Sequence, residues 1–416
     1  MKFILLALIV LTYGLDLFLT LLNHRHSRRP LPPQAQGIYD EEKYRRWLDY
    51  SLETTRFGLL VNGVMTAILL MLLASNAFGW LERLTASWFT HPILQTLAFL
   101  GVFTLFTMLL KLPFDAYSTF VIEEKFGFNK TTLRTFVSDH IKSLILMVIL
   151  GGSVVALLNY LYLVFRSHLW IFILAAWLTL SLVLVILFVL NTKVFVKIFN
   201  KLTPLPEGTL KEKIAALAES VGFQVRAISV MDASKRSTKL NAFFSGLGRT
   251  REVVLFDTLL EKLREDEILA VVAHELGHAI HKDAPRLLGV QIILFGLYAM
   301  VIGVILQSPA LAQAFGLSGA HFGFSLILLN VLLGPIGFLL SLPVNAISRR
   351  AEYAADAFAA QKAGVDSMGR ALKALAQENL ANLNPHPLYV LFYYSHPPIP
   401  ARIQAIQAFS GGNVLP

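Results

Sequence analysis

The chain contains no cysteine, which excludes disulfide bonds, thiolate zinc sites and cysteine nucleophiles. It is also poor in charge, because Asp, Glu, Lys and Arg make up only 15% of its 416 residues, against about 25% in soluble globular proteins. Hydrophobic residues make up 55% of the chain. Such a chain lacks the polar surface that keeps a soluble domain in water, and the same composition excludes disordered and fibrous proteins.

Long hydrophobic runs dominate the sequence instead. A helix that crosses a membrane needs about 20 mostly apolar residues. Segments that meet this requirement lie at residues 3–22, 57–79, 92–110, 144–165, 169–191, 287–306 and 323–346. The first segment could also be a secretory signal peptide, but its apolar run is long for one and no A-x-A cleavage site follows it. We therefore expect seven transmembrane helices, with the first retained as an anchor.

The basic residues predict how the chain lies across the bilayer. Seven Lys and Arg residues lie between the first and second spans and five between the third and fourth, whereas the opposite connections hold only Arg83 and Arg166. Because basic loops stay on the cytoplasmic side, this pattern predicts an outside N-terminus and places 192–286 and 347–416 together in the cytoplasm. The basic cytoplasmic loops then account for the net charge of +9, and we expect the lipid bilayer as a partner. We do not expect nucleic acid as a partner, since no nucleic-acid recognition motif accompanies the charge.

The sequence divides into four parts. Residues 1–191 hold the first five spans and their inside loops, and 192–286 form a polar segment whose helical and strand-like patterns predict a mixed helix–strand domain. Residues 287–346 hold the last two spans, and 347–416 form a cytoplasmic C-terminal part. Within the second part, EDEILAVVAHELGHAIHKD is predicted to be helical, with no helix breaker before Pro285.

His274, Glu275 and His278 form the motif His-Glu-x-x-His (HExxH) within that helix. Residues i and i+4 share a helix face, so both imidazoles can reach one metal ion, and the glutamate lies where it can deprotonate a water molecule. A catalytic zinc ion takes three protein ligands and a water. The alternative is an ordinary buried helix, but unpaired histidines and a glutamate are costly beside the apolar run ILAVVA. The motif therefore predicts one zinc ion per chain.

A third ligand must come from elsewhere, and the candidates are His281, Asp283 and Glu352. The first two lie on other parts of the same helix or beyond its end. Glu352 follows the seventh span directly, on the same side of the membrane as the HExxH motif, so we favour it. Asp356 lies one helical turn further on and can orient a ligating histidine.

Five segments of the chain occur in an order that is highly specific. They are LPFDAYSTFVIEEKFGFNKTT (112–132), SKRSTKLNAFFSGLGRTREVVLFDTLL (234–260), HELGH (274–278), SRRAEYAAD (348–356) and SHPPIPARI (395–403). With these motifs the sequence resembles the integral-membrane zinc metalloproteases of the CAAX prenyl protease 1 family over nearly its whole length.

The resemblance implies a mainly α membrane protein, in which seven transmembrane helices form a barrel around a water-filled chamber under a gluzincin-like α+β zinc protease domain. It also implies that Glu352 is the third zinc ligand and that Asp356 is a carboxylate behind the ligands. Asn241 and Ala242 would lie on the edge strand that binds an extended substrate, a use of sheet edges that is also expected on physical grounds. Arg349 is then a structural residue or a neighbour of the ligands.

His396 lies before Pro397-Pro398, in a rigid and non-helical turn. It can donate a hydrogen bond to the oxyanion of a tetrahedral intermediate, a contribution of ~3 kcal/mol, and the resemblance supports that role. The alternative is a loop histidine that serves packing. We also expect Arg402 to pair with a carboxylate near the site.

The chemistry expected from these residues is zinc-assisted hydrolysis of a peptide bond by an endopeptidase. In the eukaryotic members of the family the substrate is a prenylated CAAX protein, which loses its last three residues. This chain is compact, shows no obvious retention signal after SGGNVLP and carries HKD after HELGH, features that favour a bacterial inner-membrane homologue. A quality-control protease that acts on membrane proteins without prenyl groups therefore stays open, as do the cleavage rule and the oligomeric state.

Three other classes fit the sequence less well. The shorter heat-shock membrane proteases share the HExxH motif and a downstream glutamate but have fewer spans. A zinc transporter needs charged or broken positions at mid-span, for which Asp16 and Gly334-Pro335 are the evidence. An inactive scaffold requires a lost ligand, whereas the two motif histidines, Glu275 and Glu352 are all present.

Overall fold

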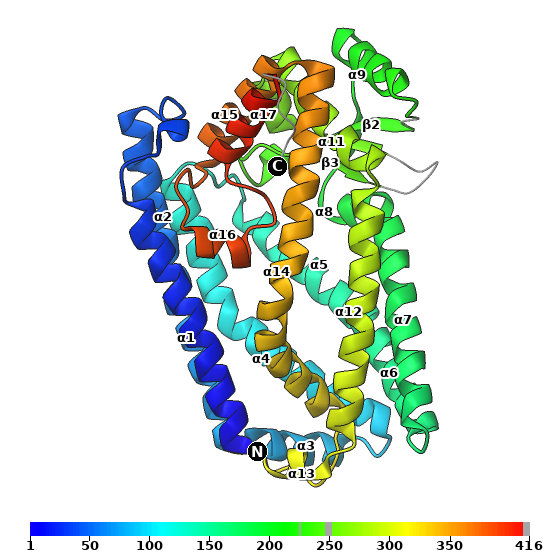
Figure 1. Cartoon of the computed structure of the whole chain (residues 1–416). Helices are drawn as coiled ribbons and strands as arrows, with labels where there is room; N and C mark the ends of the chain where they lie inside the picture. The colour runs from blue at the N-terminus through cyan, green and yellow to red at the C-terminus, as the bar shows by residue number, and fades with distance from the viewer. Residues whose placement is uncertain (224–225, 246–251, 411–416) are drawn as a thin grey trace.

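The computed structural model describes residues 1–223, 226–245 and 252–410. Long helices run side by side through most of the molecule (Figure 1). They are α1 (Lys2–Ser27), α2 (Glu41–Ala74), α4 (Pro92–Tyr117), α5 (Leu133–Leu146), α6 (Gly152–Phe165), α7 (Leu169–Leu190), α12 (Asp283–Leu306) and α14 (Phe322–Ala363). Short π-helical turns continue three of them without a break: η2 (Ser118–Glu123), η3 (Met147–Gly151) and η4 (Asn191–Val196).

With these continuations, seven helices within the described ranges are long and apolar enough to cross a membrane. Each predicted apolar segment falls on one of them, although the boundaries differ. The second segment was expected to reach residue 79, whereas α2 ends at Ala74. Asn76 adopts a left-handed conformation with φ 58°, which turns the chain into the next helix, a change of direction that apolar composition does not reveal.

The shorter helices lie at the two ends of the long ones (Figure 1). At one end lie α3 (Ala77–Trp88) and α13 (Pro309–Gln313). Towards the other end lie α9 (Thr209–Ser220), α11 (Glu265–Ile280), α15 (Val365–Asn379) and α17 (Ile399–Ser410). The remaining short helices are η1 (Pro33–Ala35), α8 (Lys197–Phe199), η5 (Ala233–Lys235), α10 (Asp257–Lys262) and α16 (Pro387–Tyr393). The HExxH motif is on α11.

A small mixed sheet lies beside α11 and positions one wall of the site. Its strands are β1 (Leu202–Pro204), β2 (Ala227–Met231), β3 (Ala242–Ser245) and β4 (Glu252–Phe256). They are ordered β1-β2-β4-β3, with β2 and β4 parallel and the other two pairs antiparallel. The strand-like patterns predicted within residues 192–286 therefore include true strands, and β3 is at an edge of the described sheet.

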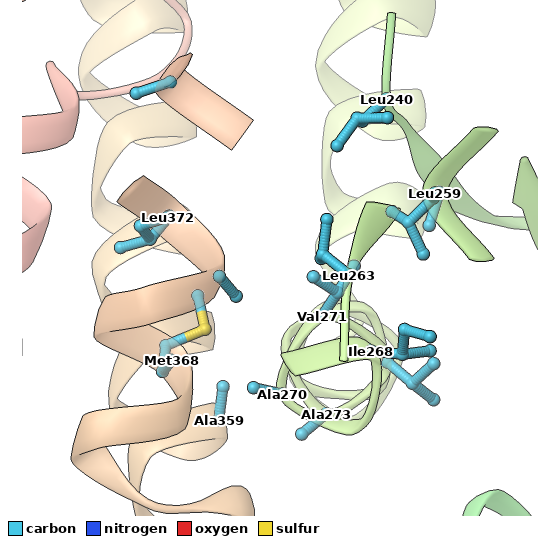
Figure 2. Close-up of a cluster of buried hydrophobic side chains, with 14 of the residues drawn as sticks. Leu240, Leu259, Leu263, Ile268, Ala270, Val271, Ala273, Ala359, Met368 and Leu372 are labelled. Atoms are coloured by element: carbon cyan, nitrogen blue, oxygen red, sulfur yellow. The ribbon is translucent and has the colours of Figure 1, made fainter. Parts of the chain in front are cut away.

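The largest hydrophobic core surrounds α11. Its apolar face packs against α14, α15 and the strand–helix segment before it, through side chains that Figure 2 shows closely gathered. The labelled members are Leu240, Leu259, Leu263, Ile268, Ala270, Val271, Ala273, Ala359, Met368 and Leu372. Burial of this face holds the helix rigidly, so the polar residues on its other face keep a fixed direction.

The structure corrects the expected course of the HExxH helix. It was predicted to have no breaker before Pro285, but α11 ends at Ile280 and α12 begins at Asp283. Lys282 is left-handed, with φ 57°, and reverses the chain between the two helices. A lysine is not a typical residue for that conformation, so the sequence carries no clear signal of the turn.

Candidate metal centre

Two helices far apart in the sequence bring the candidate ligands together. His274 and His278 are one turn apart on α11, and Glu352 lies on α14, which packs directly against α11. His278 Nε2 is 3.1 Å from His274 Nε2 and 3.3 Å from Glu352 Oε1, and His274 Nε2 is 3.5 Å from Glu352 Oε2. Among the described residues they form the one His/Cys/Asp/Glu group close enough to hold a metal ion.

These distances suit a tetrahedral zinc ion. Ligand atoms at 2.0–2.2 Å from zinc lie about 3.3 Å apart along the edges of a tetrahedron, and two imidazoles with one carboxylate are a typical catalytic donor set. Glu352 Oε2 is buried and has no hydrogen-bond partner in the described part of the chain. A buried carboxylate oxygen without a hydrogen-bond partner is costly, and coordination to a metal ion removes that cost. The residues present therefore fit the ion.

A glycine lets the two helices approach closely enough for this arrangement. Gly277 lies within the HExxH motif and faces α14 at Ala355. A Cβ atom at this position would meet Ala355 Cα at 3.0 Å and its Cβ at 3.3 Å, closer than packed side chains tolerate. Any larger residue would push α11 away from α14 and separate the histidines from Glu352.

Carboxylates behind the histidines fix the direction of both rings. Asp356 Oδ1 is 2.9 Å from His274 Nδ1, and Asp283 Oδ2 is 3.0 Å from His278 Nδ1. Such contacts direct each Nε2 atom towards a metal. Asp283 was a candidate third ligand, but the structure places it behind His278, because the turn at Lys282 folds it back.

Arg402 closes the site from α17. Its guanidinium donates to both oxygens of Asp356, at 2.8 and 2.6 Å, and lies 3.5 Å from Glu352 Oε2. The arginine is buried, and a buried cation needs such partners. The carboxylate expected to pair with Arg402 is therefore Asp356, and the pair holds α17 against α14.

Glu275 lies beside the ligands and lines a pocket of about 310 Å³. The pocket is also bounded by Phe243 and Phe244 of β3, by His278 and by residues of α11, α12 and α14. Loss of water around the Glu275 carboxyl raises its pKa above the ordinary value. A carboxylate with a raised pKa is a stronger base, so it is better suited to accept a proton and pass it on.

His396 reaches the same pocket from the loop before α17. Its Nε2 atom is 3.1 Å from Glu352 Oε1, and Ser395 Oγ lies 2.8 Å from its Nδ1 atom. The side chain is 62% exposed, so it stands at the rim of the site with room for a substrate beside it. That position allows a hydrogen bond to a bound carbonyl oxygen.

Arg349 does not touch the ligands within the described contacts. Its guanidinium donates to the carbonyl oxygens of Val390, at 3.1 Å, and Tyr394, at 2.7 Å. One turn earlier on α14, Asn345 donates to the carbonyl of Phe392 at 2.7 Å. Both residues hold the C-terminal end of α16 against α14. The sequence carries no signal that predicts this contact.

Asn241 and Ala242 lie at the start of the edge strand. Ala242 is buried and pairs with Leu255 of β4, and the Asn241 side-chain oxygen accepts a hydrogen bond from the Ala242 amide. The next residues, Phe243 and Phe244, line the pocket, although the sequence had not singled them out. Adjacent residues of a strand point to opposite faces of the sheet, so alternation alone does not predict that both residues line one pocket.

The fold and the site define a membrane-embedded metallopeptidase with an HExxH helix. Residues 20–201 match the family described as CAAX prenyl protease N-terminal, five membrane helices, and residues 204–410 match peptidase family M48. A CAAX prenyl protease 1 homolog of Oryza sativa subsp. japonica is 34% identical, over 97% of this chain and 96% of its own. The human homolog is 31% identical, over 96% of this chain and 94% of its own.

A solved structure shows the same fold. The crystal structure of S. mikatae Ste24p superposes with a TM-score of 0.92 at 30% identity, over 97% of this chain and 98% of that one. The chain belongs to the CAAX prenyl protease 1 family and is a zinc-dependent metallopeptidase of the membrane. The relatives named here are eukaryotic, so the bacterial origin favoured by the sequence gains no support from them.

Proposed function

We propose that this chain removes the C-terminal tripeptide from prenylated CAAX proteins, using a zinc ion held by His274, His278 and Glu352. The observation that carries the proposal is the meeting of these three donors at tetrahedral spacings, with Glu275 beside them at the pocket. Full-length relatives named CAAX prenyl proteases support the choice of substrate.

The residues around the ligands supply the proton transfers. A zinc ion bound there supplies Lewis-acid chemistry, polarising the scissile carbonyl and acidifying a water molecule. Glu275 accepts a proton from the attacking water and delivers it to the leaving amine. His396 donates a hydrogen bond to the oxyanion. Asp283 and Asp356 keep the ligand rings in place, and Arg402 balances the charge of Asp356.

The edge strand orients the peptide. The outer edge of β3 has no partner strand within the described sheet, so an extended substrate can add to it as a further strand. Asn241 and Ala242 begin this edge, and Phe243 and Phe244 line the pocket, where an apolar substrate group is favoured.

We also propose that the seven apolar helices form a barrel around a chamber, with an outside N-terminus and a cytoplasmic zinc site. A cavity of about 540 Å³ among α1, α2, α14 and α16 supports the chamber, and the loop charges support the orientation. The four-part division of the chain and a bacterial inner membrane stay predictions.

A paired peptide assay tests the proposed function. Purified, zinc-loaded protein in detergent is given a farnesylated CAAX peptide or the same peptide without the lipid, with Glu275→Gln as the blank. We expect release of the C-terminal tripeptide from the farnesylated peptide, with a weaker reaction on the other. Equal cleavage of both peptides would overturn the prenyl preference. No cleavage of either would overturn the CAAX substrate and favour unmodified membrane proteins.

A further inference from the structure

Asp16 is a carboxyl group at membrane depth that the proposed chemistry does not use. It lies near the middle of α1, one of the helices long and apolar enough to cross a membrane. A charged side chain there is expensive, and such residues face a partner or a polar cavity. Asp16 lines the cavity of about 540 Å³ among α1, α2, α14 and α16, named here the α1–α14 cavity.

The partners of Asp16 leave its charge uncompensated. Tyr393 donates its hydroxyl to Asp16 Oδ1 at 2.6 Å. No Lys, Arg or His among the described residues lies within ion-pair distance of this carboxylate, although the ion pairs found elsewhere in the chain are numerous. A single hydroxyl does not balance the charge of a carboxylate at membrane depth, so a cationic group is favoured beside it.

The α1–α14 cavity has the lining that a basic side chain requires. Around Asp16 it carries further polar groups, and its remaining wall is apolar. The polar groups are Thr12, Tyr13, Asn62, Thr66, Asn330 and Ser341. The apolar groups are Ile9, Met65, Leu69, Val331, Phe338 and Phe392. A lysine or arginine buries its hydrocarbon stem against apolar surface and needs acceptors only at its end.

A metal ion fits this cavity less well. Calcium takes six to eight oxygen ligands, mostly from carboxylates and carbonyls, whereas Asp16 is the one carboxylate that lines the cavity among the described residues. One of its oxygens already accepts the hydrogen bond of Tyr393. A compact organic cation with its own apolar stem suits the lining better.

The α1–α14 cavity lies close to the zinc site. Tyr393 lines it and is three residues from His396, so their Cα atoms are at most about 11 Å apart. Along α14, Ser341 lines the cavity and Ser348 lines the zinc pocket, a separation of about 10 Å on a continuous helix. A peptide of a few residues can therefore span both sites.

We propose that the α1–α14 cavity is a subsite for a lysine or arginine side chain of the peptide substrate, with Asp16 as its counter-charge. The subsite rests on the proposed peptidase function, because a peptide cut at the zinc site would reach the cavity with a side chain only a few residues from the cleaved bond. Tyr393 is a positioning residue that holds the Asp16 carboxylate in place and links the subsite to the segment carrying His396.

Substrate series measure this preference directly. In farnesylated CAAX peptides, one lysine is moved through the six residues before the cysteine, and each peptide is compared with its norleucine counterpart. We expect one or two adjacent positions at which lysine lowers KM about tenfold against norleucine. Asp16→Asn, which keeps an acceptor for Tyr393, should reduce this KM ratio to about one. For a peptide with glutamate at that position, Asp16→Lys should restore the low KM.

The control variant is Asp115→Asn. Asp115 is also on a membrane helix, but it lies 3.8 Å from Lys111 and lines a different cavity, of about 420 Å³. It should keep the tenfold ratio. A lysine preference that survives Asp16→Asn, or the absence of any preferred position in the wild type, overturns the subsite.

A binding arm separates this inference from the proposed function. Glu275→Gln protein binds fluorescent forms of the same lysine and norleucine peptides, and anisotropy gives both dissociation constants without cleavage. If the wild type cleaves none of the peptides but lysine still tightens binding through Asp16, the proposed function fails and the subsite stands. Equal binding of both peptides overturns the subsite whether or not cleavage occurs.

Discussion

Asp283 and Asp356 each lie behind one histidine of the HExxH motif, at 3.0 and 2.9 Å from its Nδ1 atom. A carboxylate can only accept there, so each ring is held with its Nε2 atom free to bind a metal. The two contacts therefore fix the direction of both ligands before any metal binds, and Arg402 holds Asp356 in turn.

Loss of either carboxylate should weaken zinc binding. Asp283→Asn and Asp356→Asn are expected to lower zinc affinity about 10–100-fold, because the rings lose their orientation and part of their basicity. Competition with a fluorescent chelator measures the affinity in detergent. Asp366→Asn, on the first turn of α15, serves as the control. Unchanged affinity in both variants would show that the contacts do not support the site.

Most of the proposed ligand set could be predicted at the residue scale, but its surroundings could not. The HExxH spacing singles out two histidines on one helix face, and Glu352 follows from its place beside the seventh span. From the sequence Asp283 is a candidate ligand, because nothing in it shows the left-handed turn at Lys282. Phe243 and Phe244 reach the pocket through a strand register that only the folded sheet sets.

At the scale of the elements, the contact between α11 and α14 decides whether a metal site exists. Each helix carries part of the ligand set, and Gly277 lies against Ala355 where they are closest. Hydropathy and spacing predict both helices. They do not predict that the two meet at this glycine, because the contact joins segments about eighty residues apart.

Gly277→Ala should damage both stability and zinc binding. The added methyl group meets backbone and side chain of Ala355 at 3.0–3.4 Å, and overpacking of this kind costs about 1–3 kcal/mol. Thermal unfolding and zinc content measure the two effects. Gly369→Ala is the matched control, since it is on helix α15 with open space around it and should be neutral or stabilising. Equal behaviour of the two variants would contradict the close-contact account.

Helix α16 should act on the reaction through His396. Arg349 holds the carbonyls of Val390 and Tyr394, just before that histidine. We expect Arg349→Met to lower kcat about tenfold, a fraction of the 10²–10³-fold that loss of an oxyanion donor costs, with partial recovery in Arg349→Lys. In a His396→Ala background, Arg349→Met should cost nothing further. A full tenfold loss in that background would assign Arg349 a purely structural role.

At the scale of the whole molecule, the proposed zinc ligands come from α11 of the peptidase domain and from α14, a helix that runs on through the membrane region (Figure 1). The apolar segments of that region were predicted from hydropathy alone, because about 20 apolar residues leave few alternatives. The arrangement of the helices around cavities was not predictable in that way, since it depends on which faces pack together. That arrangement is expected only from the family resemblance.

Zinc should therefore stabilise the whole fold. At free zinc 100-fold above its dissociation constant, binding to the native state alone contributes about 2.7 kcal/mol. Removal of zinc by a chelator should lower Tm, and readdition should restore it. Glu352→Gln should show a much smaller zinc-dependent shift. A Tm that does not respond to zinc in protein shown to bind it would contradict a site shared between α11 and α14.

The central claim is that Glu275 transfers protons at a zinc site formed by His274, His278 and Glu352. The most direct test compares wild type and Glu275→Gln at equal, measured zinc content on a farnesylated CAAX peptide, with the released tripeptide quantified by mass spectrometry. We predict one zinc per chain in both proteins and a rate about 10²–10⁴-fold lower in the variant. Cleavage by the variant at the wild-type rate, with zinc present, would contradict the account.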